Sequence, residues 1–245
     1  KVIVVTGGTG VLGASMVEYL ALHGAKVAVL ARNKEKGDEQ IEHVRSKGGD
    51  ALFLQTDVTD EAVLRQNAEA IIARYGKIDA LINGAGGNMP GATIGPKNTI
   101  LDLKMDDFRK VVDLNLMGTV VPTVIFAEYM VKEKKGNIIN ISSASALRPL
   151  SRVAGYGAAK AAVTNFTKYM AGELAIKFGE DFRVNALCPG FFITEQNRNL
   201  LTNPDGTYSD RGNTIIAHTP FRRFGNPADL LGTLHYLVSD ASRFV

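Results

Sequence analysis

The sequence predicts an α/β fold in which helices cover both faces of a parallel sheet. Short apolar runs alternate along the chain with longer segments of helical spacing, and most of these runs are apolar almost throughout. Alternating strands and helices form parallel sheets with right-handed crossovers, and strands buried on both faces lack polar alternation. A length of 245 residues with 45% hydrophobic residues suits one domain, which we place at residues 1–245.

Six runs rich in β-branched residues are expected to be strands. They are residues 1–6, 26–31, 51–56, 79–83, 137–142 and 183–188. Four segments between them have helical spacing, namely residues 11–24, 59–76, 106–136 and 156–179. Thr59 is a plausible N-cap, Gly24 and Gly76 are plausible helix ends, and Pro122 predicts a bend in the third helix.

Two glycine clusters are expected to meet at one end of this sheet. Six strands in the doubly wound, Rossmann-type order open a crevice at the carboxyl ends of the first and fourth strands. "TGGTGVLGA" (residues 6–14) follows the first strand and "NGAG" (83–86) follows the fourth. Glycines let the backbone approach a pyrophosphate, and the next helix directs free N–H groups at it. A glycine turn without a ligand is the alternative. The predicted dinucleotide contacts here are Gly7, Gly8, Thr9, Gly10, Val11, Leu12, Gly13, Asn83, Gly84, Ala85 and Gly86, with Asp57 and Val58 beside the adenine.

The end of the second strand indicates which dinucleotide binds. "LARNKEK" places Arg32 and Asn33 at the decisive position, and no carboxylate occurs before Glu35. A carboxylate there binds the ribose 2′-hydroxyl of NAD, whereas an arginine accommodates the 2′-phosphate of NADP. We therefore expect NADP, with NAD as the alternative. Arg32 could also be a surface residue in a polar turn.

Four polar residues are candidates for the chemistry. Tyr156 and Lys160 are four apart at the start of a helix and so share one face. An ammonium group beside a tyrosine lowers the phenol pKa and makes it a general acid or base. Ser143 follows a strand end, where its hydroxyl can polarise a substrate oxygen, or can simply belong to a loop. Asn115 lies within a predicted helix although asparagine is a poor helix former. It either serves a local backbone group or marks a functional position.

These residues, in this order, resemble the short-chain dehydrogenase/reductase family over essentially the whole chain. The resemblance implies hydride transfer between NAD(P) and a carbonyl or secondary alcohol. It implies Tyr156 as proton donor, Ser143 as ligand of the reacting oxygen, and Lys160 as a group that also holds the nicotinamide ribose. It also implies that Asn115 supports a water relay. Contacts to the nicotinamide are implied for Pro189, Gly190 and Thr194.

The sequence departs from the family pattern at two positions. Members of this length usually have glycine where Val11 stands, and Gly10 restores the spacing of longer members, so the cradle is expected to work. "NGAG" has Gly84 where asparagine is usual. The sequence ends at "SDASRFV" (239–245), where the family chain normally continues through a seventh strand.

Within the family, "AGGNMPGAT" and an insert at about residues 194–224 resemble bacterial sugar-acid enzymes of the D-mannonate oxidoreductase (fructuronate reductase) group, followed by gluconate-type dehydrogenases. The insert is rich in polar residues, whereas a 3-oxoacyl reductase would need an apolar lid. We expect Ser143, Asn88, Arg148 and Arg152 to contact the substrate, because arginine binds carboxylates bidentately. A non-catalytic dinucleotide-binding regulator on the same fold is the alternative of another class.

Composition argues against several other classes. The net charge is only +3, and "KEKK" (132–135) closes a predicted helix, so nucleic-acid binding is not expected. No apolar stretch is expected to approach the roughly 20 residues that span a bilayer, and the first apolar run is unlike a signal peptide. Cys188 is the single cysteine, which fits a cytoplasmic protein, and no metal site is expected. A homo-oligomer, either dimer or tetramer, is expected from apolar side chains on the two long helices: Val120, Val124, Phe166, Met170 and Leu174.

Overall fold

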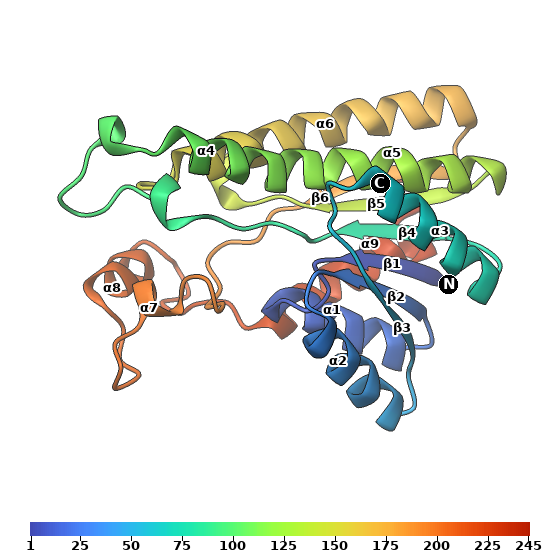
Figure 1. Cartoon of the computed structure of the whole chain (residues 1–245), viewed down its shortest axis with the longest axis horizontal. Helices are drawn as coiled ribbons and strands as arrows, with labels where there is room; N and C mark the ends of the chain where they lie inside the picture. Colours follow the sequence, from blue (N-terminus) through green and yellow to red (C-terminus); the bar gives the residue numbers. More distant parts are fainter.

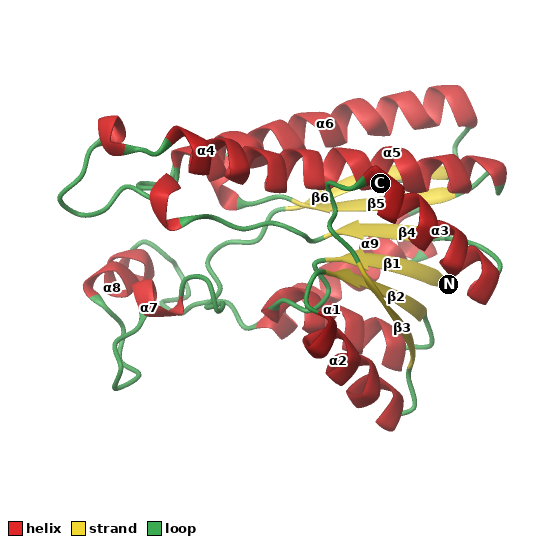
Figure 2. Ribbon diagram, viewed as in Figure 1, coloured by secondary structure: helices red, strands yellow, loops and turns green.

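A computed structural model describes residues 1–245 and contains one six-stranded parallel sheet (Figures 1 and 2). The strand order is β3-β2-β1-β4-β5-β6, the doubly wound order that the sequence predicts. The strands are β1 (Val2–Thr6), β2 (Lys26–Ala31), β3 (Asp50–Gln55), β4 (Ala80–Asn83), β5 (Gly136–Ile141) and β6 (Phe182–Leu187). Each lies within one residue of its predicted bounds at either end.

Helices form a layer on each face of the sheet. One layer holds α1 (Val11–Leu22), α2 (Lys34–Ser46) and α9 (Leu231–Val238). The other holds α3 (Glu61–Tyr75), α4 (Met105–Val112), α5 (Gly118–Lys132) and α6 (Ala154–Phe178). Two short helices, α7 (Arg198–Leu201) and α8 (Asp210–Ala217), lie beyond the sheet. Single turns connect these elements: η1 (Pro90–Ala92), η2 (Ile100–Asp102), η4 (Ala144–Ala146), η5 (Pro227–Leu230) and η6 (Asp240–Ser242).

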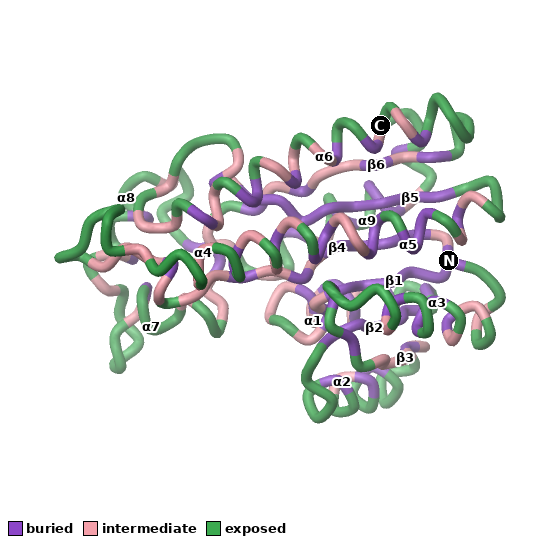
Figure 3. The backbone as a smooth tube through the Cα atoms, turned by 45° about the horizontal axis from the view of Figure 1, so that its top comes forward, coloured by how far each residue is buried: buried purple, intermediate pink, exposed green.

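The strands are buried because successive side chains enter opposite layers (Figure 3). In β1, Ile3 and Val5 pack with α1, α2 and α9, whereas Val2 and Val4 pack with α3, α5 and α6. All four side chains are 2% exposed or less. This two-sided burial explains why β1 is apolar almost throughout, and the parallel direction of the strands places the loops that follow them at one edge of the sheet.

The third predicted helix is irregular about two turns earlier than expected. Pro122 lies inside α5, and the distortion is the π-helical turn η3 (Asp113–Met117) between α4 and α5. A π-helical turn admits one extra residue and is found often at functional sites. The bend predicted at Pro122 is therefore better described as a bulge that centres on Asn115.

The combined helix Met105–Lys132 is long and apolar enough to cross a membrane, by length and composition alone. This corrects the expectation that no segment would approach that length. Half of its most apolar window is buried inside the protein, where α5 packs against β4 and β5. A core helix of an α/β protein meets the same criterion for that reason.

The predicted insert folds over the carboxyl ends of the strands. Figure 1 shows α7 and α8 on the same side as α4, facing it across the end of the sheet. Leu201, Ile215 and Phe224 form a small apolar cluster of their own, apart from the two main cores. The insert therefore has an apolar interior, which its polar composition did not predict.

Candidate active site

A cleft of about 950 Å³ lies at the carboxyl ends of the strands, between the sheet and the insert. Most predicted site residues line it: Gly7, Thr9, Gly10, Val11, Leu12, Gly13, Arg32, Asn33, Asp57, Val58, Gly84, Ala85, Gly86, Asn88, Ser143, Arg152, Tyr156, Lys160, Pro189, Gly190 and Thr194. Four predicted residues do not line it: Gly8, Asn83, Asn115 and Arg148. Most of the predicted residues are therefore brought together at one cleft, and their roles there stay predictions.

The glycine loop contains glycines that the fold needs and one that it does not. Gly7 has a φ of +66°, and a Cβ on Gly13 would lie 2.3 Å from the Gly7 carbonyl oxygen. Gly10 has an ordinary φ of −77°, and its added Cβ would approach that oxygen only to 3.4 Å. Backbone geometry therefore does not require glycine at position 10. A ligand that approaches closely would require it.

The start of α1 fits an anion. Gly10 is the N-cap, no side chain caps the helix, and no acidic residue lies in its first turn. Gly10 to Gly13 line the cleft, so the first N–H groups and the positive end of the helix dipole face it. A pyrophosphate would satisfy these groups, and Val11, as the first helical residue, does not obstruct them.

The end of β2 carries positive charge into the cleft. Arg32 takes part in no ion pair, whereas Asn33 caps α2 by accepting a hydrogen bond from Lys36 N at 2.9 Å. Asp57 accepts hydrogen bonds from the N–H (3.0 Å) and hydroxyl (2.7 Å) of Thr59. These bonds, and then the charge of Arg32, lower the Asp57 pKa. Asp57 is thus held in its turn, and Arg32 is free to meet a ligand.

Asn83 lies beneath the cleft. It is 1% exposed, and its amide donates to Thr123 of α5 and to the Asn140 side chain of β5, both at 2.8 Å. Asn140 in turn donates to Thr167 of α6 at 2.9 Å. This buried chain ties the two long helices to the sheet. Asn83 therefore ties α5 and β5 to β4, and its direct contact with a cofactor stays a prediction.

Close contacts favour glycine at both glycine positions of "NGAG". A Cβ on Gly84 would lie 2.8 Å from the Thr6 carbonyl oxygen, so a side chain at this position would require the backbone to shift. A Cβ on Gly86 would lie 2.6 Å from Asn115 Oδ1 and 3.2 Å from Lys160 Nζ. Gly86 is thus the point where the loop after β4 meets two of the predicted catalytic residues.

Asn115 holds that loop in place. Its amide nitrogen donates to the carbonyls of Gly87 (2.6 Å) and Val111 (2.8 Å), and its Oδ1 accepts from Gly87 N at 3.1 Å. Both amide hydrogens are therefore used on backbone groups. The geometry makes Asn115 a positioning residue, and a part in a water relay stays a prediction.

Ser143, Tyr156 and Lys160 meet at the centre of the cleft. Ser142 bonds to α6 through the Lys160 carbonyl (3.2 Å) and Thr164 (2.6 Å), whereas the Ser143 hydroxyl accepts a hydrogen bond from Ser145 N at 3.1 Å, and both serines line the cleft. Lys160 Nζ donates to the Ile141 carbonyl at 2.8 Å and lies 5.7 Å from the centre of the Tyr156 ring. The first two turns of α6 thus place the ammonium group near the Tyr156 ring.

The pKa shifts of Tyr156 and Lys160 differ in part from those expected. Burial raises the pKa of Tyr156, and its hydrogen bond with the Ser143 hydroxyl lowers it by less. Burial lowers the pKa of Lys160 to about 8, opposed by a smaller effect of Cys188. The expected lowering of the phenol pKa by Lys160 is therefore not seen in the chain alone, where desolvation dominates both groups.

The substrate end of the cleft has unpaired polar groups. Asn88 donates to the Thr93 hydroxyl at 2.8 Å, and its Oδ1 is buried with no partner. Arg152 lines the cleft, whereas Arg148 is exposed outside it. Arg211 of α8 also lines the cleft and was missed. Only the folding of the insert brings it there, so no local sequence signal marks it.

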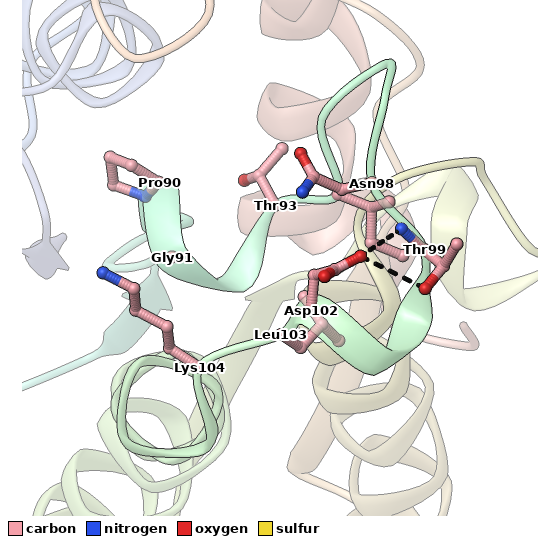
Figure 4. Close-up of a pocket in the computed structure, with 9 residues that line it drawn as sticks. Pro90, Gly91, Thr93, Asn98, Thr99, Asp102, Leu103 and Lys104 are labelled. Atoms are coloured by element: carbon pink, nitrogen blue, oxygen red, sulfur yellow. Dashed lines mark hydrogen bonds between the residues drawn. The ribbon is translucent and has the colours of Figure 1, made fainter.

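A second hollow of about 310 Å³ lies beside the cleft, around η1 and η2 (Figure 4). Asp102, its only carboxylate, accepts hydrogen bonds from the N–H (2.7 Å) and hydroxyl (3.2 Å) of Thr99. None of the predicted catalytic residues lines this hollow. The chemistry belongs to the larger cleft.

Comparison with known proteins identifies the family. The short chain dehydrogenase model matches residues 1–205. The uncharacterized oxidoreductase UxuB of Bacillus subtilis is 42% identical over 98% of this chain and 88% of its own length. The chain belongs to the short-chain dehydrogenase family.

Two further similarities bear on the activity. The crystal structure of a candidate D-mannonate oxidoreductase from Haemophilus influenzae with bound NAD has a TM-score of 0.90 and 37% identity, covering 98% of this chain and 89% of that one. A 3-oxoacyl-(acyl-carrier-protein) reductase of Synechocystis is 32% identical over 98% of this chain and 90% of its own length. These similarities confirm that this short-chain dehydrogenase is an oxidoreductase that uses a nicotinamide dinucleotide.

Proposed function

We propose that this short-chain dehydrogenase interconverts a carbonyl and a secondary alcohol in a sugar acid, with D-fructuronate and D-mannonate as the first candidate pair. The observation that carries the proposal is the cleft, in which Ser143, Tyr156 and Lys160 lie next to unpaired cationic and amide groups. Its similarity to a candidate D-mannonate oxidoreductase supports the same substrate class.

The chain's own residues handle the substrate oxygen and its proton. When bound, the nicotinamide supplies or accepts the hydride. Ser143 donates a hydrogen bond to the reacting oxygen, and Tyr156 gives that oxygen a proton during reduction or removes it during oxidation. Lys160 Nζ lies 5.7 Å from the centre of the Tyr156 ring, and its ammonium would stabilise the anionic phenol once the cofactor and substrate are bound, although burial dominates the phenol in the chain alone. Asn115 keeps the loop after β4 in place beside Lys160.

We propose NADP as the preferred cofactor. The uncapped start of α1 would hold the pyrophosphate, and Arg32 would bind the 2′-phosphate by charge-assisted hydrogen bonds. Pro189, Gly190 and Thr194 line the part of the cleft beyond β6, where they would meet the nicotinamide. NAD, which the Haemophilus influenzae relative binds, is the alternative.

A 3-oxoacyl thioester is the second candidate substrate. Phe191, Leu200 and Ile215 line the insert side of the cleft and offer an apolar wall that the sequence did not predict. The Synechocystis relative supports the same reading. Gluconate-type oxidation stays within the first proposal, since it needs the same carboxylate and hydroxyl contacts.

Turnover assays separate these candidates. The parent enzyme should oxidise NADPH much faster with D-fructuronate than with an acetoacetyl thioester. The Tyr156→Phe variant should lose most of the D-fructuronate activity but bind NADPH normally, because only the proton-transfer group is removed. Faster turnover of the thioester would replace the sugar-acid proposal. NADPH binding without turnover of any carbonyl compound would favour a non-catalytic dinucleotide-binding protein.

A further inference from the structure

Two arginines from separate segments face the substrate end of the cleft. Arg152 precedes Tyr156 by four residues, and Arg211 lies in the first turn of α8 in the insert. Both line the cleft and are partly buried. Arg211 donates one hydrogen bond, to the Ser151 carbonyl at 3.4 Å, and neither guanidinium takes part in an ion pair.

No acidic side chain of the cleft neutralises this pair. The cleft has two carboxylates, of which Glu195 is paired with Lys36 at 3.0 Å and Asp57 is hydrogen-bonded to Thr59. Burial and the charge of Arg152 both lower the pKa of Arg211. Two like charges are thus held close together in a partly desolvated place, an arrangement that costs free energy until an anion binds.

Backbone strain occurs at the same place. Arg152 has a φ of +74°, the left-handed region that favours glycine. A hydrogen bond from Ile94 N to the Arg152 carbonyl, at 2.9 Å, helps to hold this conformation. Strain at a non-glycine residue is retained where the surrounding structure needs that side chain in that position. The strained residue here carries one of the two unpaired charges.

We propose that Arg152 and Arg211 together bind the carboxylate of the substrate. Guanidinium groups bind carboxylates through pairs of parallel hydrogen bonds, and an anion between these two would relieve their repulsion. Because Arg211 belongs to the insert and Arg152 to the segment before α6, the carboxylate also joins the insert to the catalytic helix. The inference rests on the proposed sugar-acid activity for the identity of its ligand.

The test uses single and double substitutions with matched controls. Arg152→Gln and Arg211→Gln remove the two charges, while Arg148→Gln and Arg198→Gln remove charges from the same two segments outside the cleft. D-gluconate is titrated calorimetrically into each protein saturated with NADP⁺, and D-glucitol serves as the neutral probe. Each cleft substitution should weaken D-gluconate binding about 10- to 100-fold, since hydrogen bonds to charged groups are lost. The two controls should bind D-gluconate like the parent, and all variants should bind NADP⁺ alike.

Arg152→Gly separates binding from folding. Glycine adopts the positive φ without strain, so this variant should melt no lower than the parent and still lose D-gluconate affinity. Equal binding of D-gluconate by the parent and the double variant would overturn the inference, as would a parent that binds no D-gluconate. If only the proposed sugar-acid activity is wrong, D-gluconate binding will still depend on both arginines, but no sugar acid will be turned over.

Discussion

Replacing Lys160 with methionine is expected to stabilise the protein while removing its activity. The lysine is 4% exposed, and burial lowers its pKa from 10.5 to about 8. At 1.36 kcal/mol per pKa unit, the buried charge costs the folded state about 3 kcal/mol at pH 7. Methionine fills similar space but leaves the Ile141 carbonyl without its hydrogen bond, which costs about 1 kcal/mol. The net gain in unfolding free energy is about 2 kcal/mol.

The sign of the pH dependence follows from the lowered pKa. Between about pH 8 and pH 10.5 the unfolded chain binds more protons at this lysine than the folded chain does. The stability of the parent therefore rises with pH in that window, whereas methionine has no proton to lose. The advantage of Lys160→Met should be largest at pH 7 and smaller by about 1.3 kcal/mol at pH 9.

Urea unfolding followed by circular dichroism, without cofactor, at pH 7 and pH 9 measures both effects. Lys168→Met is the matched control, because Lys168 is exposed on the same helix, and it should change stability by less than about 0.5 kcal/mol. A Lys160→Met protein less stable than the parent at pH 7 would refute the reasoning. So would an equal difference at both pH values.

Three further predictions concern the cofactor and the assembly. Gly10→Ala should fold like the parent, because its Cβ has room, but should bind NADPH about tenfold more weakly in a fluorescence titration. Gly13→Ala should instead lower the urea midpoint of unfolding, because its Cβ would collide with the Gly7 carbonyl oxygen. Arg32→Ala should lower kcat/KM for NADPH about 10- to 100-fold and leave that for NADH nearly unchanged; a parent that prefers NADH would contradict the NADP assignment. Light scattering at micromolar concentration should show a dimer or tetramer that Val124→Glu weakens, and a monomeric parent would exclude this assembly.

The surface expected to support assembly is only partly as predicted. Met170 and Leu174 pack into the core under α6, so they are not available to a partner. Val124 is 47% exposed, and Tyr169 and Ile176 of α6, which the sequence did not single out, are 64% and 81% exposed. Hydrophobic periodicity does not tell which face of a long apolar helix meets the sheet, because both faces carry large side chains.

Local pattern was sufficient for the sheet and for the prediction of a cleft at one end of it. The strands β1, β4 and β5 are buried throughout, whereas the edge strands β3 and β6 are buried only in part, but all are rich enough in apolar residues to be identified without tertiary information. The other two signals are local as well. The glycine loop leads into α1, and Tyr156 and Lys160 are four residues apart in α6. Helix α2 was not singled out, since its buried positions, Gly37, Ile41 and Val44, form a narrow stripe in a mostly polar segment.

Roles that depend on distant partners could not be read in this way. The buried bonds of Asn83 run to residues 40 and 57 positions later in the chain. Arg211 reaches the Ser151 carbonyl, 60 positions earlier, only after α7 and α8 have folded around their apolar cluster. Sequence position can therefore indicate that a polar residue is out of place in its helix or strand. Only its hydrogen-bond partners in the folded chain show whether it can contact a ligand or supports a loop.

The ion pair between Lys36 and Glu195 joins two segments that line the cleft. It ties the first turn of α2 to the loop that leads into the insert, and both side chains are largely exposed, at 48% and 73%. An exposed pair of this kind contributes about 0.2–1 kcal/mol, which shifts a two-state equilibrium by no more than about fivefold. An oxidoreductase of this kind releases its used dinucleotide in every catalytic cycle. A weak ion pair beside the cleft slows that release little, whereas a stronger one would slow release and with it turnover.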